Sequence, residues 1–185
     1  MRLKAHLESF GLRQTFARFS LLTLVSLGLI ACGFHLRGNI PLPAGLSPMY
    51  IETDSPYNPL VQAIKDHLTA YHITLADSPK TANTVLRIIH IETSESLVSV
   101  SASTNTRQYA LAQTLKMELM GKKGQTIVPL SKLAATNPFT VESSQVLSAS
   151  SQKQALVGDM QQALVMQLMA KLASQDAKHS LALQK

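Results

Sequence analysis

The chain has 185 residues, with one cysteine, no tryptophan and only 5% aromatic residues. A single cysteine excludes the internal disulfide framework that many small exported domains use. Charged residues make up 15% of the chain, against an average of about 25%, which excludes a disordered, solvating chain. No basic residues alternate with aromatic ones, so the net charge of +6 does not indicate a nucleic-acid binder.

The sequence also lacks an apolar run long enough to span a membrane as a helix. Its longest such run, from Phe19 to Ile30, would reach about 18 Å as a helix, whereas a bilayer core is about 30 Å thick. Four basic residues and one acidic residue precede the run. A basic start and a short apolar core are typical of a secretory signal peptide. We therefore predict a signal peptide over residues 1–31 that is removed.

The one cysteine, Cys32, ends the sequence Leu29-Ile30-Ala31-Cys32, which resembles the box of bacterial lipoproteins. In that box the cysteine is acylated on its sulfur and, after cleavage, on its α-amino group. The alternative is a free core cysteine behind an ordinary signal peptide. Because two or more acyl chains anchor stably, we predict a protein held on a membrane surface by covalent lipid on Cys32, without any other cofactor. Gly33 follows in place of the Asp that is associated with inner-membrane retention, which favours the periplasmic side of the outer membrane.

The mature chain predicts one α+β domain over residues 49–173, with a Gly- and Pro-rich tether over 32–48 and a flexible tail over 174–185. One amphipathic helix is predicted over 59–71, capped by Asn58, and a second over 151–173. Extended segments, most clearly the alternating 107–120, are predicted at 49–52, 84–100, 107–120, 126–130 and 139–147. This order is compatible with both helices covering one face of a mostly antiparallel sheet.

Three details of the sheet are left open by the sequence. The apolar phase of the second extended segment changes around Thr93–Ser96, which indicates a bulge or a bend there. Pro129 cannot donate to a strand ladder, so its strand is at an edge or bulged. The face that carries Ala110, Ala112 and Lys116 is polar, and it meets either solvent or a partner.

Catalytic and metal-binding patterns are missing. There is no G-x-S-x-G motif, and His67 and His72 are not spaced as an i, i+4 zinc pair. Glu92 and Glu95 lie in a serine-rich segment that is typical of solvated charge. We therefore predict that the protein is not an enzyme and holds no metal. Four basic residues could bind an acidic ligand such as phosphate, and the alternative is that they are ordinary solvated surface charges: Arg87, Arg107, Lys122 and Lys123.

The segment Cys32-Gly33-Phe34-His35-Leu36-Arg37-Gly38 is similar to the mature start of the LPS-assembly lipoprotein family, LptE. The order of elements also matches, including an expected turn at Asn137-Pro138-Phe139. The resemblance implies two helices packed on one face of a four-stranded sheet. It further implies a non-catalytic plug inside the outer-membrane β-barrel LptD that helps the barrel to assemble and assists lipopolysaccharide (LPS) insertion.

The resemblance also bears on LPS contact, because basic residues near the tip of the central hairpin are associated with it in the family. Here Ser101–Asn105 contains no cation. Arg107, Lys122 and Lys123 therefore remain the candidate ligands of LPS phosphates. Two other functions are considered: a free-standing envelope lipoprotein that binds a small amphiphile or another envelope complex, and a periplasmic hydrolase, for which no reactive constellation is present.

Overall fold

The computed structural model describes residues 41–101, 103, 105–142 and 146–174. The predicted signal peptide, Cys32 and residues 175–185 of the predicted tail lie outside the described residues. The described elements are, in order, η1 (Ala44–Leu46), β1 (Met49–Thr53), α2 (Pro59–Ala70), β2 (Thr84–Ser101), β3 (Thr106–Gly121), β4 (Thr126–Glu142) and α3 (Val146–Leu172).

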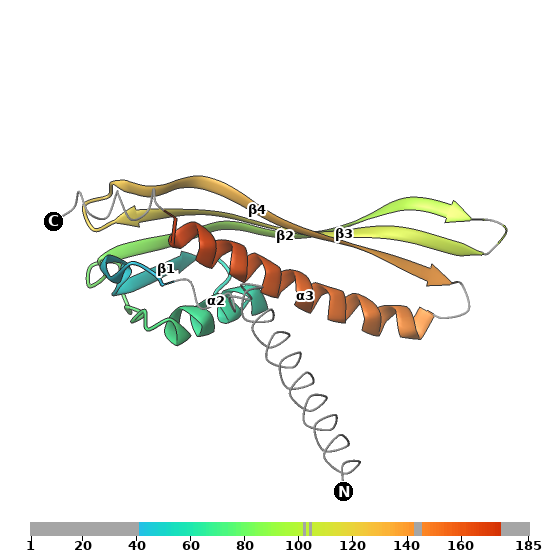
Figure 1. Ribbon diagram of the computed structural model, residues 1–185, viewed down its shortest axis with the longest axis horizontal. Coiled ribbons are helices and arrows are strands. Elements are labelled where there is room, and N and C mark those ends of the chain that lie inside the picture. The colour runs from blue at the N-terminus through green and yellow to red at the C-terminus, as the bar shows by residue number, and fades with distance from the viewer. Residues whose placement is uncertain (1–40, 102, 104, 143–145, 175–185) are drawn as a thin grey trace, which may run out of the picture. The chain divides into compact units, whose positions relative to one another are not determined.

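The strands form one four-stranded sheet in the order β1-β2-β3-β4. β1 runs parallel to β2, and the other neighbours are antiparallel. α3 lies along the sheet, and α2 lies on the same side near β1 (Figure 1). The predicted α+β fold, with two helices on one face of a mostly antiparallel four-stranded sheet, is confirmed.

The start of α2 follows from its local sequence. The Asn58 side chain accepts a hydrogen bond of 2.9 Å from the backbone N–H of Leu60, and Pro59 occupies the first helical position. A proline is tolerated there because its missing N–H would have no partner inside the helix. The predicted boundaries of this helix, including its cap, are confirmed within one residue.

The main core lies between the helices and the sheet. The apolar side chains that alternate along β3 are buried, including Leu115, Met117 and Leu119. They meet a layer of fully buried residues from the helices: Leu60, Ile64 and Leu68 of α2, and Leu164, Leu168 and Leu172 of α3. Each fully buried leucine contributes about 1.5–3 kcal/mol, so this one interface dominates the free energy of folding.

A buried polar residue separates this core from a second, smaller cluster. Leu111, Phe139 and Met160 form the second cluster, in which the rings of Tyr109 and Phe139 stack with centroids 5.3 Å apart. Gln113 lies between the clusters on β3 and is 3% exposed. Its Nε2 donates to Oγ1 of Thr93 at 3.1 Å, but its Oε1 has no hydrogen-bond partner among the described residues.

The prediction of two separate extended segments at 126–130 and 139–147 is wrong, because β4 is one strand over Thr126–Glu142. The turn expected at Asn137-Pro138-Phe139 is also wrong, since Pro138 lies inside β4 opposite Ala110. β4 is an edge strand, where a proline without an N–H is tolerated. Pro129 lies on the same edge strand and also in a register shift, so both alternatives for it are confirmed.

Bulges occur in β2, but not where the sequence placed one. The register shifts lie between Ile88 and His90 and between Leu97 and Ser99, and the strand is continuous through 93–96. The intervening Glu92–Ser96 contains no apolar residue, so the hydrophobic pattern could not locate the change. Ile89 and Val98, the extra residues, are 44% and 59% exposed.

Two element boundaries also differ from the prediction. α3 begins at Val146 rather than Ser151. The sequence indicates a helix start at Ser151, because Gln154 follows three residues later as in a capping box, but Ser151 lies within the helix. At the other end of the domain, the predicted tether includes packed residues. Leu46 of η1 is fully buried, and its carbonyl accepts a hydrogen bond of 2.6 Å from Oγ1 of Thr84. The packed part of the chain therefore begins before residue 49.

Replacement of the buried amide tests this description of the core. Gln113→Met keeps the length of the side chain and removes the unsatisfied Oε1, while the exposed Thr93 hydroxyl can turn to water. We expect the free energy of unfolding, measured by urea titration, to rise by about 1 kcal/mol. A loss of stability of similar size would mean that Oε1 has a partner that the described residues do not supply.

Candidate functional site: the open face of the sheet

The face of the sheet opposite the helices, called here the open face, has no described element packed on it. Its residues alternate along each strand with the buried ones. Because the register aligns the strands, the open face consists of rows that run across them. Its charged residues are concentrated in the half near β1: Glu52, Arg87, His90, Glu92, Lys116, Glu118 and Lys132.

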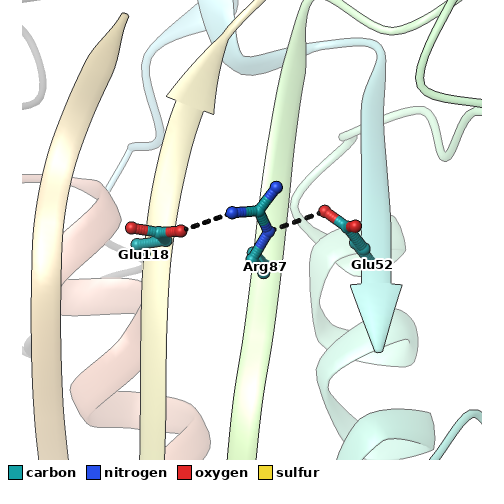
Figure 2. Close-up of polar contacts among 3 residues, drawn as sticks. All are labelled: Glu52, Arg87 and Glu118. Atoms are coloured by element: carbon teal, nitrogen blue, oxygen red, sulfur yellow. Dashed lines mark hydrogen bonds and ion pairs between the residues drawn. The ribbon is translucent and has the colours of Figure 1, made fainter. Parts of the chain in front are cut away.

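The residues of one row are joined to each other by ion pairs (Figure 2). Glu52, Arg87 and Glu118 are register partners on β1, β2 and β3. The Arg87 Nε donates to Oε2 of Glu52 at 2.8 Å, and its Nη1 donates to Oε1 of Glu118 at 2.9 Å. The guanidinium thus links three strands, which a lysine with a single ammonium group would do less well.

These contacts change the electrostatics of Arg87. The hydrogen bond to Glu52 and the charge of Glu52 raise the pKa of Arg87, with a smaller contribution from Glu118 that partial desolvation opposes. The guanidinium, which is charged in any case, already donates to two carboxylates. Arg87 was one of the four candidate phosphate-binding residues, but its guanidinium is engaged by two carboxylates of the protein itself.

The Glu52–Arg87–Glu118 row has an excess of negative charge, whereas the neighbouring row is positive. His90, Lys116 and Lys132 are register partners on β2, β3 and β4. His90 lies 3.9 Å from Glu92, measured from Nε2 to Oε2. Neither lysine forms an ion pair with a described residue, and both are exposed. The two lysines, called the lysine pair below, are thus two like charges directly opposite each other.

The predicted phosphate ligands do not form one site. Arg107 is the second residue of β3, whereas Lys122 and Lys123 follow its other end. Strand geometry of about 3.3 Å per residue separates the two positions by about 50 Å. All three side chains are exposed, so each is available to a ligand, but no single headgroup reaches both ends.

No buried active site is evident among the described residues. A pocket of about 250 Å³ lies where β1 ends, lined by Thr53, Asp54, Ser55 and Ile88–Ile91. Among residues 41–174 with their gaps, no three potential ligands come together to hold a metal ion. No described helix has the length and apolar character needed to cross a membrane.

Two exposed surfaces carry almost no charge. Only three of the 27 residues of α3 are charged, and of these Lys153 is paired with Glu95. Asp159 is the one charged residue among the exposed positions of the described part of α3. The distal half of the open face, farther from β1, carries one charged residue, Glu142, at its far end, and otherwise consists of small or uncharged residues: Ser94, Ser96, Ser99, Gln108, Ala110, Ala112, Thr136, Pro138 and Thr140.

Sequence analysis missed the lysine pair because half of it lies in an unrecognised segment. The alternation of β3 correctly places Lys116 on the polar face. Lys132, however, lies in a stretch for which no strand was predicted, since Ser131–Asn137 has few large apolar residues. If the pairing of β3 with β4 had been predicted, including its bulge, the two lysines would have been recognised as register partners.

Comparison with solved structures identifies the fold. An uncharacterized lipoprotein B from Nitrosomonas europaea matches with a TM-score of 0.63 and 20% identity, over 82% of this chain and 96% of that one. The rare lipoprotein B from Shewanella oneidensis matches with a TM-score of 0.59 and 16% identity, over 75% and 100%. The chain has the fold of these bacterial lipoproteins.

Comparison of sequences identifies the family. The family model LptE, described as lipopolysaccharide-assembly, matches residues 46–172. The LPS-assembly lipoprotein LptE of Pectobacterium atrosepticum is 28% identical over 174 residues, which cover 89% of this chain and 93% of the relative. That of Yersinia enterocolitica is 29% identical over 157 residues, covering 82% and 73%. The chain belongs to the LptE family of LPS-assembly lipoproteins.

The role of the Arg87 row can be tested by its dependence on salt. We expect Arg87→Gln to lower the urea midpoint at about 0.01 M salt, where screening extends over about 30 Å, because two carboxylates then lack their cation. At about 1 M salt, where the Debye length is about 3 Å, the difference from the parent protein shrinks. Arg87→Lys should fall between the two. An equal difference at both salt concentrations would contradict an electrostatic role.

Proposed function

We propose that this LPS-assembly lipoprotein is a non-catalytic plug inside the lumen of the outer-membrane β-barrel LptD. In this role it helps the barrel to assemble and assists insertion of LPS into the outer leaflet. Membership in the LptE family supports a role in LPS assembly. The observation that carries the plug role is the nearly uncharged exterior of α3 and of the distal open face.

The argument rests on what a barrel lumen requires of its contents. The lumen of a large outer-membrane barrel is polar, so a plug must offer hydrogen-bonding groups. Each charge on the plug would need an opposite charge on the wall, because a desolvated charge without a partner is costly. An exterior of Ser, Thr, Gln and Ala meets both demands. A surface designed to keep a domain soluble carries about 25–35% charged residues.

Contact with LPS phosphates is proposed for Arg107, Lys122 and Lys123. Their separation along β3 means that Arg107 and the two lysines act on different molecules or at different stages of transfer. Arg87 is left out of this set because its donors are engaged by Glu52 and Glu118.

Isolation of the complex tests the plug role. From membranes solubilised in mild detergent, we expect the tagged protein to copurify with LptD at equal stoichiometry, because a plug is enclosed by its barrel. Depletion of the protein should lower the level of assembled LptD in the outer membrane. A tagged protein recovered without any barrel, together with normal LptD levels after depletion, would favour the free-standing lipoprotein instead.

The anchor is tested separately. We propose that Cys32 carries the lipid that holds the protein on the periplasmic side of the outer membrane. Mass spectrometry of the mature N-terminus should find an acylated cysteine, and Cys32→Ala should abolish the modification and release the protein from outer-membrane fractions. An unmodified thiol at position 32 in the wild-type protein would contradict the anchor without contradicting the plug.

A further inference from the structure

The lysine pair is an arrangement that sheets normally avoid. Lys116 on β3 and Lys132 on β4 are direct register partners. Cβ atoms of such partners lie about 4.5–5.5 Å apart, and like charges at that position destabilise the sheet. The isolated domain thus carries a local electrostatic cost on its open face. A nearby anion would remove this cost.

The nearby carboxylates of the described chain are already engaged. Glu118, two residues along β3 from Lys116, is paired with Arg87, and Glu52 is paired with the same guanidinium. Glu92 lies next to His90, and Glu95 binds Lys153. No described carboxylate lies within ion-pairing distance of the lysine pair. The described residues therefore supply no anion that neutralises the lysine pair.

The surroundings of the lysine pair leave room for a close approach. The next residues along the same face are small on both strands, namely Thr114 and Ala112 on β3 and Ala134 and Thr136 on β4. On their distal side the two ammonium groups therefore border a surface of small side chains on β3 and β4, while His90, Glu92 and Glu118 border them elsewhere. A partner with its own flat surface, such as the wall of a sheet, can lie against it.

The charges around the lysine pair favour a carboxylate over a phosphate. Glu92 and Glu118 lie on the same face, each two residues along its strand from a member of the row, Glu92 from His90 and Glu118 from Lys116. They repel a group with two negative charges more strongly than one with a single charge. On the basis of the proposed plug function, we propose that Lys116 and Lys132 together bind an Asp or Glu side chain on the inner wall of the LptD barrel, which fixes the open face against that wall.

A single charge reversal separates this role from a structural one. In the free protein, Lys132→Glu places an opposite charge facing Lys116, so the urea midpoint should rise. In the complex the same variant places a carboxylate against the wall's carboxylate, so recovery of LptD with the tagged protein should fall about tenfold. A merely structural role would move stability and capture in the same direction.

Two further variants serve as controls. Lys116→Arg with Lys132→Arg keeps both charges and should capture LptD as the parent does. Lys80→Glu lies on an exposed turn outside the sheet and makes the same change of charge as Lys132→Glu, so it should leave capture unchanged. Capture by Lys132→Glu at the parent level would overturn the inference, as would a loss of retained LPS with barrel capture intact.

The test also distinguishes failure of the inference from failure of the proposed function. If the parent protein captures no barrel, the plug role itself is wrong and the inference falls with it. If the parent captures the barrel and Lys132→Glu does so equally well, the plug role stands and only the contact is wrong. Equal loss in Lys80→Glu would also overturn the inference, because net charge and not position would then decide capture.

Discussion

Both helices lie on one face of the four-stranded sheet, and this arrangement determines the exposed surfaces of the domain. The helices also cannot cover the whole length of that face. α3 has 27 residues, which reach about 40 Å as a helix, whereas the 18 residues of β2 extend over about 60 Å. The hairpin of β2 and β3 therefore extends past the described start of α3 (Figure 1), and Leu97, Val98 and Val100 near its tip are 55–62% exposed.

On the open face, the charges nearest β1 are paired with one another, whereas those of the lysine pair are not paired with a described residue. Next to β1, one guanidinium balances two carboxylates across three strands. One row farther along the strands, two lysines face each other without a carboxylate from the described chain. Such a pair is unusual, because like charges directly opposite each other destabilise a sheet. In the bound state that we propose, a carboxylate of the partner supplies the missing charge.

Where the sequence predicted the structure, a single physical signal was strong. The cap and proline defined α2, and strict alternation defined β3, since each depends on residues next to one another in the chain. Prediction failed for β4, because Ser131–Asn137 is stabilised by pairing with β3 and by half-buried Leu133 and Ala135 rather than by its own pattern. The site was missed for the same reason: the lysine pair and the Arg87 row exist only through register. The candidate cations Arg107, Lys122 and Lys123 were chosen by residue type, and the predicted strand over 107–120 correctly places Arg107 at its start and the two lysines just past its end.

The two ends of β3 differ in what they offer to a lipid. At the tip, Arg107 is the register partner of Val100, and exposed Leu97 and Val98 lie on the same strand. A cation beside exposed apolar side chains suits an amphiphile, because the phosphate and the acyl chains can both be accommodated. At the other end, Lys122 and Lys123 lie in a turn between Gly121 and Gly124, where no described apolar side chain accompanies them in the turn. The tip therefore places exposed apolar side chains beside its cation, and the turn does not.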